Sequence, residues 1–353
     1  MDFNLIIRGG TVVDGSGAPS FKADVALRED HIAAIGELSG QTTEREIDAQ
    51  GLVVSPGFID NHTHDDGYLL THPAMLPKIS QGVTSVVIGN CGIGLAPLRG
   101  KEIVPPLNLL GEPDLFRFET FNAFLSELDR NPAAVNAIPL VGHTTLRVNA
   151  MECLERAATR QETTAMRRDL EEALDAGAVG FSTGVFYPNA NAATAQEVIE
   201  VGAPLRGKGA VYCAHIRNEG DWILVALEEA FEIGRQLEAH TVISHHKLVG
   251  VHNHGRSGET LCHQMIEVGI DIVLQSHHVG RRKLAARFED LVDSGGPPRS
   301  FPSGTYRWLI SGRSNSAVCR GDDSTRRIVD ARQSIVSDEP GPIAGCIPSS
   351  IDR

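Results

Sequence analysis

The chain opens with short apolar runs that alternate with polar residues and are separated by turn residues. These runs are Leu5–Ile7, Thr11–Val13, Ala23–Leu27 and Ile32–Ile35. Glycine-rich turns, such as Gly9-Gly10 and Asp14-Gly-Ser-Gly17, lie between them. Strand-like runs bounded by glycine predict short β-strands. Residues 1–55 are therefore expected to form a small all-β element.

From Gly57 onward, apolar strands alternate with amphipathic helical segments. The predicted strands are Gly57–Asp60, Thr84–Ile88, Ala137–Val141, Ala178–Ser182, Ala210–Ala214 and Thr241–Ser244. The predicted helices are Thr120–Asp129, Thr159–Ala176, Ala195–Gly207 and Trp222–Leu237. Repeated βα units are typical of α/β folds with a parallel sheet. The pattern favours a (β/α)8 TIM barrel that lacks its last two strands over a doubly wound sheet, because no GxGxxG turn follows a strand.

The composition changes near residue 258. Residues 1–258 hold 20 Lys and Arg against 33 Asp and Glu, whereas residues 259–353 hold 12 of each, so the net charge of −13 arises in the first part. Eleven of the later cations are Arg, and Ser, Pro and Gly also gather there. A C-terminal extension, a slipped reading frame and a divergent lobe with a strand near Gly269–Leu274 all stay open. We therefore treat 1–55, 56–258 and 259–353 as separate units.

The overall composition excludes several protein classes. A chain of 353 residues with 41% hydrophobic residues is long enough for one large globular domain and a smaller one. Its acidic charge, without a Lys/Arg cluster in residues 1–258, makes nucleic acid a poor partner. No apolar run approaches the roughly 20 residues of a membrane span. Scattered cysteines and an N-terminus without a basic, apolar leader predict a cytoplasmic location.

Metal-binding residue types follow the first two predicted strands of the barrel. His62 and His64 come directly after the first strand, and residues at i and i+2 on a strand share a face. Cys91 follows the second strand, among glycines. Solvated histidines and a buried apolar cysteine are the ordinary alternatives. Because barrels place their chemistry at the carboxyl ends of strands, these residues are expected at one site.

The later strands add further candidates. The fifth and sixth strands end at His215 and His245, and a set of imidazole and thiolate donors suits Zn²⁺ better than Mg²⁺ or Ca²⁺. Taken alone, each histidine could equally be a hydrogen-bonded residue of the core. Cys213 lies inside its strand and is expected in the core. For His143 we favour a structural role, and Tyr187 could donate a hydrogen bond to substrate or cap its loop.

Several motifs, in order along the chain, resemble the amidohydrolase superfamily. They are Gly9–Gly15, Pro56–His64, Gly89-Asn-Cys-Gly92, Gly180–Gly184, His215-Ile-Arg217 and His245-His-Lys247. The cysteine stands where a metal-bridging carboxylated lysine is usual, and this resembles the N-acyl-D-amino-acid deacylases, or D-aminoacylases. The resemblance covers roughly residues 1–258. It implies a distorted TIM barrel with a small β-sandwich that combines the N-terminal segment with strands returning from the C-terminus.

The resemblance also implies a metal centre. His62 and His64 would be ligands of a more exposed metal site. Cys91 would supply the thiolate of the buried site and bridge the two, with His215 and His245 as the imidazole ligands of the buried site. One Zn²⁺ would bind tightly and a second more weakly.

The implied activity is hydrolysis of an N-acyl-D-amino acid to a carboxylate and a free D-amino acid. Tyr187, Arg217 and Lys247 would contact the carboxylate or acyl carbonyl of this small-molecule substrate. Zn²⁺ polarises an amide carbonyl and lowers the pKa of water to about 7, and the leaving amine needs a proton. In the superfamily an Asp after the eighth strand supplies it, but its motif is not found, and Asp322 is a weak local candidate.

Three functional hypotheses stay open. The first is a zinc-dependent deacylase, either active or truncated with weak or no activity. The second is a cyclic-amide hydrolase of the dihydroorotase or hydantoinase type, although those enzymes expect a lysine in place of Cys91. The third is a non-catalytic metal-binding scaffold that keeps the ligands and has lost the acid/base.

Overall fold

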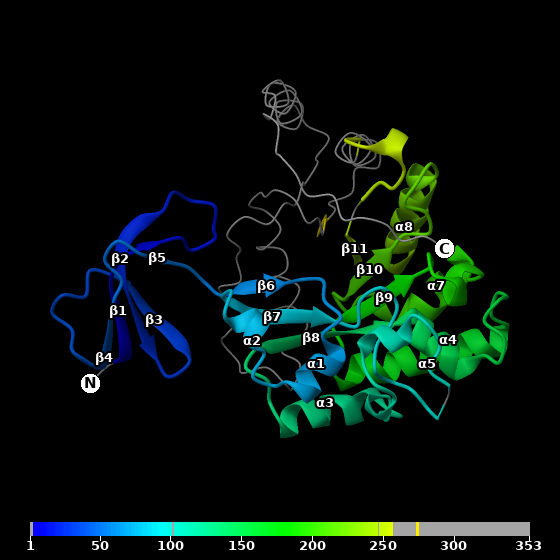
Figure 1. Cartoon of the computed structure of the whole chain (residues 1–353), viewed down its shortest axis with the longest axis horizontal. Helices are drawn as coiled ribbons and strands as arrows, with labels where there is room; N and C mark the ends of the chain where they lie inside the picture. Colours follow the sequence, from blue (N-terminus) through cyan, green and yellow to red (C-terminus); the bar gives the residue numbers. More distant parts are fainter. Residues whose placement is uncertain (1–2, 101, 246, 257–272, 275–353) are drawn as a thin grey trace, which may run out of the picture.

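Two separate β-sheets organise the computed structural model, which describes residues 3–100, 102–245, 247–256 and 273–274 (Figure 1). The smaller sheet has the order β3-β2-β1-β4, and β5 pairs with β1. Its strands are β1 (Phe3–Val12), β2 (Phe21–Arg28), β3 (His31–Gly36), β4 (Thr43–Asp48) and β5 (Val53–Val54). A small apolar cluster of Val12, Ala23 and Val25 is buried against it.

The smaller sheet differs from the sequence prediction in detail. The runs predicted at residues 5–7 and 11–13 form one strand, β1, which is irregular between Ile7 and Gly10. β4 was not predicted, because its sequence Thr-Glu-Arg-Glu-Ile-Asp is mostly charged and exposed. The described residues form a single sheet here, so the expected β-sandwich stays a prediction.

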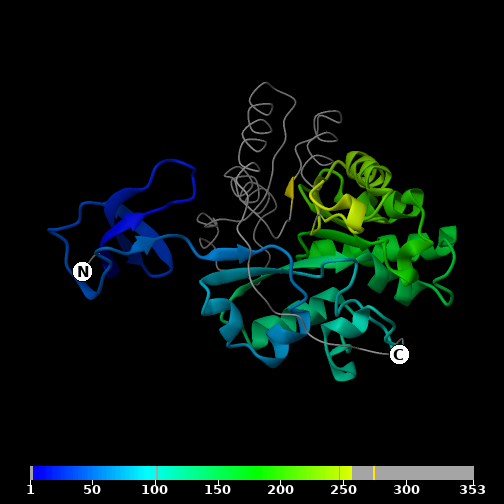
Figure 2. The same ribbon diagram turned by 45° about the horizontal axis from the view of Figure 1, so that its top comes forward.

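The larger sheet is parallel throughout and has the order β12-β11-β10-β9-β8-β7-β6. It curls, and helices cover its outer face (Figure 2). Its strands are β6 (Phe58–Asp60), β7 (Val83–Ile88), β8 (Asn136–Gly142), β9 (Gly180–Gly184), β10 (Val211–His215), β11 (His240–Ile243) and β12 (Val273–Leu274). Together with the helices between its strands, this is the expected α/β arrangement of a partial barrel.

Helices connect the strands of the larger sheet. They are α1 (Asp66–Thr71), α2 (Leu76–Ile79), α3 (Phe121–Arg130), α4 (His143–Ala150), α5 (Arg160–Ala176), α6 (Pro188–Asn191), α7 (Ala195–Gly202) and α8 (Ile223–Leu237), with short 3₁₀ turns at Leu107–Leu110, Pro113–Leu115, Ala203–Leu205 and Val251–Asn253. The start of α5 is fixed by a capping box, in which Thr159 and Glu162 satisfy each other's backbone amides. Thr120 and Thr194 cap α3 and α7 with their side chains alone, which accept from the amides of Ala123 and Glu197.

Three sequence expectations need correction. β9 begins at Gly180 instead of Ala178. The helix predicted over 195–207 ends as α7 at Gly202 and becomes a 3₁₀ turn, because Pro204 lacks the amide hydrogen that a continuing helix needs. α4 was missed, since its threonines and valine have low helix propensity. β12, the seventh strand of the sheet within the described residues, lies inside the strand-like run 269–274 that the sequence offered as one alternative.

The interior of the larger sheet is filled by inward-pointing side chains of alternate strand positions. They are Val87, Ile138, Leu140, Val211, Cys213 and Val242. Cys213 is therefore a core residue, as the sequence predicted. A second, larger apolar cluster fills the space between sheet and helices. Among the described residues, no helix combines the length and hydrophobicity needed to cross a bilayer.

Candidate metal centre

Five side chains meet at the carboxyl edge of the larger sheet. His62 and His64 follow β6, Cys91 follows β7, His215 ends β10 and His245 follows β11. Their donor atoms form one group of His62, His64 and Cys91 and a second group of Cys91, His215 and His245, each within 4.8 Å. The fold thus brings together all five residues that the sequence nominated. Cys91 belongs to both groups.

The loop after β7 holds Cys91 in an unusual backbone conformation. Cys91 has a φ of +54°, in the left-handed region that few side chains adopt. The backbone amide of the next residue, Gly92, donates a hydrogen bond of 3.0 Å to Ser182 on β9. The carbonyl oxygen of Cys91 would lie 2.0 Å from a Cβ placed on Gly184. Direct packing of this loop on β9 therefore sets the direction of the thiol.

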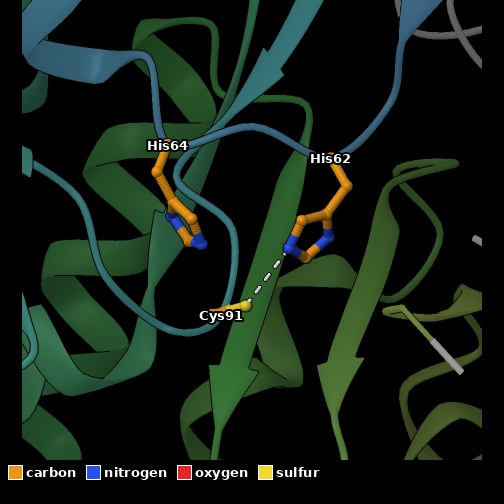
Figure 3. Close-up of side chains that lie close together, drawn as sticks. All are labelled: His62, His64 and Cys91. Atoms are coloured by element: carbon orange, nitrogen blue, oxygen red, sulfur yellow. Dashed lines mark hydrogen bonds between the residues drawn. The ribbon is translucent and has the colours of Figure 1, made fainter. Parts of the chain in front are cut away.

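The thiol of Cys91 lies close to one histidine of each donor group, and the rings of these two histidines are 4.8 Å apart. Its Sγ is 3.3 Å from Nε2 of His62 (Figure 3) and 3.4 Å from Nε2 of His245. The rings of His62 and His64 are 5.5 Å apart, while those of His215 and His245 are only 4.3 Å apart. A cation beside this sulfur would thus be within reach of imidazoles of both donor groups.

Burial keeps these donors neutral. Burial raises the pKa of the Cys91 thiol to about 12, and the opposing effects of a hydrogen bond with Tyr187 and of the Lys247 charge are smaller. Burial, together with the charge of His245, lowers the pKa of His215 to about 3. The pKa of His64 is also lowered, mainly by burial. The two imidazoles are therefore uncharged at neutral pH, and each offers a lone pair.

The donor set fits a borderline-soft divalent cation such as Zn²⁺. Nδ1 of His64 and Nδ1 of His215 are buried without a hydrogen-bond partner. Buried polar atoms usually have a partner, so such atoms point to a ligand. Imidazole nitrogen and thiolate sulfur are the typical ligands of Zn²⁺, which could offset the cost of ionising Cys91.

A buried carboxylate that sequence reasoning missed lies behind the histidines. Glu219 is 4% exposed. Its Oε1 is 3.3 Å from Nε2 of His215 and 3.3 Å from Nδ1 of His245, and its Oε2 is 2.9 Å from Nζ of Lys247. Burial would raise its pKa, but the hydrogen bonds to His245 and Lys247 lower it below the usual value. The only sequence signal was its position four residues after His215.

Aromatic side chains cover one side of the site. The ring of Tyr187, which follows β9, lies 4.9 Å from that of His215, and its hydroxyl interacts with Cys91. Phe186 stacks on His215 with ring centroids 5.2 Å apart. Lys247 is half exposed, and its Nζ lies 2.9 Å from Oε2 of Glu219. Tyr187 and Lys247 therefore lie beside the candidate ligands, as the sequence anticipated.

Arg217 is engaged elsewhere in the structure. Its guanidinium donates to both carboxylate oxygens of Glu229 on α8, at 2.7 to 3.1 Å. It also donates to the carbonyl oxygens of Asn191 and Ala193, at 2.6 and 2.8 Å. These contacts use all three nitrogens, so Arg217 holds the segment after β9 to α8.

His143 lies outside this set of side chains. It is completely buried, and its Nε2 is 3.3 Å from Oε1 of Glu197. Glu197 also pairs with the buried Arg147. His143 thus belongs to an internal polar network, in line with the structural role expected for it.

Comparisons with known proteins identify the family. The sequence profile of the amidohydrolase family matches residues 45–311. The chain belongs to the amidohydrolase family. Within this superfamily its relatives of 42–58% identity are deacylases of D-amino acids, as the Gly89-Asn-Cys-Gly92 motif indicated. It is 58% identical over 259 residues to an N-acyl-D-aspartate deacylase of Alcaligenes xylosoxydans xylosoxydans, covering 73% of this chain and 52% of that protein.

Solved structures of amidohydrolases support the same family assignment. A D-aminoacylase described as having a binuclear metal centre, with one-metal activation and second-metal attenuation, is 52% identical with a TM-score of 0.75, covering 78% of this chain and 58% of that one. The N-acyl-D-glutamate deacylase of Bordetella bronchiseptica, in complex with zinc and a phosphonate inhibitor, is 40% identical with a TM-score of 0.73, covering 78% and 59%. This amidohydrolase chain spans about half the length of the curated relatives it matches.

Proposed function

We propose that this chain carries the metal centre of a zinc-dependent N-acyl-D-amino-acid deacylase. Its reaction would be hydrolysis of a linear amide to a carboxylate and a free D-amino acid. The observation that carries the proposal is Cys91, which belongs to two donor groups at the carboxyl edge of a parallel sheet. Relatives named as deacylases of D-amino acids support the substrate class.

The five donors would divide between two metal positions. Cys91, His215 and His245 would hold the tightly bound Zn²⁺, because Cys91 and His215 are almost completely buried. His62 and His64 are partly exposed and would hold a second, weaker ion with the same thiolate. When bound, Zn²⁺ polarises an amide carbonyl and acidifies a water molecule.

Two side chains beside the metal positions would bind the substrate. The Lys247 ammonium is half exposed and fixed by Glu219 at 2.9 Å, so it would pair with the substrate carboxylate. Tyr187 stands next to Cys91 and His215, and its hydroxyl would donate a hydrogen bond to the acyl oxygen. Arg217, for which the same role was expected, has its donors occupied by Glu229 and two carbonyls and would instead position the Tyr187 segment.

Neither candidate for the general acid is supported by the described residues. Asp322, the weak sequence candidate, lies outside the described residues, as does every residue from 275 onward. Glu219 is committed to Lys247 and two histidines, which lower its pKa and make it a poor proton donor at neutral pH. Turnover by this chain is therefore proposed, and so are its cytoplasmic location and the unit boundaries at residues 55 and 258.

A cyclic-amide hydrolase is less well supported. Such enzymes expect a lysine at the position of Cys91, and the relatives of high identity are deacylases of linear amides. A non-catalytic metal-binding scaffold would bind zinc without turnover, whereas a deacylase would bind zinc and hydrolyse its substrate.

The test is amine release by the zinc-loaded full chain. N-acetyl-D-aspartate, N-acetyl-D-glutamate and N-acetyl-D-methionine are compared with their L-enantiomers. D-selective release of amine that disappears on chelation supports the deacylase. Zinc-loaded protein that releases no amine from any of the six compounds would leave the scaffold as the better account.

A further inference from the structure

Glu219 contacts more of the site than any sequence motif suggested. One oxygen, Oε1, lies 3.3 Å from both His215 Nε2 and His245 Nδ1. The other, Oε2, lies 2.9 Å from the Lys247 ammonium. The carboxylate thus joins the end of β10 to the segment after β11.

The backbone around Glu219 is tied down as well. Its carbonyl oxygen accepts a hydrogen bond of 2.8 Å from the amide of Val249. The side chain of Asn218 accepts from the amides of Gly220 and Trp222, at 2.9 and 3.2 Å, which fixes the turn that leads into α8. A side chain on such a fixed turn holds its partners in place with little loss of conformational entropy on its own part.

The contact with His245 has a chemical consequence. A carboxylate can only accept from an imidazole N–H, so Glu219 favours the tautomer of His245 with its proton on Nδ1. Nε2 then carries the lone pair, and Nε2 is the atom that lies 3.4 Å from Cys91 Sγ. Carboxylate partners of this kind orient ligating histidines and increase their basicity.

The contact with Lys247 acts on the substrate side. Nζ of Lys247 lies 3.4 Å from Nδ1 of His245, and an ammonium can only donate, so without Glu219 it would favour the opposite tautomer, with the lone pair on Nδ1. The carboxylate lies against both groups and can accept from each of them, which removes this competition. One residue therefore sets the tautomer of a metal ligand and the position of a substrate-binding cation.

We propose that Glu219 is a positioning residue that orients His245 toward the metal and holds Lys247 at the substrate position. The inference rests on the proposed function, because it takes Cys91, His215 and His245 as the metal ligands.

The test uses Co²⁺ titration of the metal-free full chain, read from the thiolate-to-cobalt absorption and from the visible bands that report coordination. Glu219→Gln keeps the size of the side chain and removes its charge, and it is expected to weaken Co²⁺ binding 10- to 100-fold. Glu219→Asp keeps a carboxylate and should recover part of the affinity. Circular dichroism of each metal-free variant checks that it folds.

Glu127→Gln is the matched control. Glu127 is also a partly buried glutamate that pairs with a cation, but it lies on α3 and its partners include Arg117, so it contacts none of the candidate ligands. This variant should leave Co²⁺ affinity within threefold of the wild type. Equal affinity of Glu219→Gln and wild type, or an equal loss in Glu127→Gln, would overturn the inference. A wild-type chain that binds Co²⁺ without a thiolate band would instead overturn the proposed function beneath it.

Discussion

At the residue scale, the unusual feature is a thiol held between two groups of imidazoles. Cys91 is 1% exposed and keeps a left-handed backbone conformation. Conformations of this kind cost about 1–3 kcal/mol and persist where the surrounding structure enforces them. A buried thiol with a pKa of about 12 is inert until a cation offsets the cost of its charge. The position and backbone conformation of Cys91 are explained better by a role as a metal ligand than by apolar packing.

The two metal positions should respond differently to mutation. Cys91→Ala and His215→Ala should each remove the tightly bound zinc, because they take away buried ligands of that position. His62→Ala should lower only a weaker second occupancy. Zinc retained after dialysis, measured by elemental analysis, distinguishes these cases.

Cys213→Ala provides the control for the loss of a buried cysteine. Cys213 is 3% exposed and packs in the interior apolar cluster. This variant should lose some stability and keep its zinc. Equal loss of zinc from Cys91→Ala, His215→Ala and His62→Ala would contradict the two-site account.

The sequence predicted the five candidate ligands but missed the residue behind them. His62, Cys91 and His245 could be found because strand ends in a parallel barrel meet at one edge. Glu219 could not, since a glutamate in a loop is usually solvated and its burial depends on Lys247 and two histidines from separate strands. The family resemblance implied that Arg217 contacts substrate, and nothing in the sequence indicated its pairing with Glu229 on the following helix.

At the element scale, the loop after β7 and the segment after β9 shape the site together. The loop after β7 packs by its backbone on β9. The second carries Tyr187, and Arg217 and Arg147 hold it through hydrogen bonds to the carbonyl oxygens of Asn191, Ala193 and Asn189. Two arginines on separate elements thus fix one short segment over His215.

Gly184→Ala tests the close contact between β9 and the Cys91 loop. The added Cβ would lie 2.0 Å from the carbonyl oxygen of Cys91, so the loop must shift. We expect a loss of stability of about 1–3 kcal/mol and weaker zinc binding. Gly40→Ala, whose Cβ would meet nothing within 4 Å, should change neither. Urea unfolding and zinc titration measure the two effects, and unchanged zinc affinity in Gly184→Ala would contradict this role of the contact.

The buried Glu197 should make stability fall in acid. Its pKa is lowered to about 2; burial opposes this, but hydrogen bonds from His143, from the Ala158 amide and from Arg147 outweigh burial. A depressed carboxyl pKa gives stability that is complete above the unfolded value of about 4.5 and is lost as pH falls toward 2. Urea unfolding should show a slope up to about 1.4 kcal/mol per pH unit steeper in the wild type than in Glu197→Gln. Identical slopes would refute the assignment.

At the scale of the whole molecule, the larger sheet has two end strands within the described residues, β6 and β12. Open edges of parallel sheets present unpaired amides and carbonyls to other chains. β6 and β12 contain only three and two residues, and among the described residues no further strand pairs with their outer sides. The family match continues to residue 311, past the composition change at 258.

The purified chain should therefore associate or bind a hydrophobic dye, and its hydrolysis of N-acyl-D-amino acids should be weak. Size-exclusion chromatography with light scattering and dye fluorescence measure the first two properties. A stable monomer without dye binding, turning over in the ordinary enzyme range of about 1–10³ s⁻¹, would contradict this expectation.

Most strands of the larger sheet could be predicted from the sequence, but the residues at which they begin and end could not. Strands such as β7 and β10 contain the apolar runs Val86–Ile88 and Val211–Ala214, which are typical of buried parallel strands. β4 carries charges on an exposed sheet, so only its pairing with β1 makes it a strand. The strand-like run 269–274 contains β12, which the structure describes as two residues paired with β11.

X-ray absorption at the zinc edge of the zinc-loaded full chain tests the central claim most directly, because it reports the atoms bound to the metal. The account predicts one sulfur at about 2.3 Å together with imidazole nitrogens at about 2.0–2.1 Å, and loss of the sulfur in Cys91→Ala. A shell of nitrogen and oxygen alone in the wild-type chain would contradict a metal centre built on Cys91.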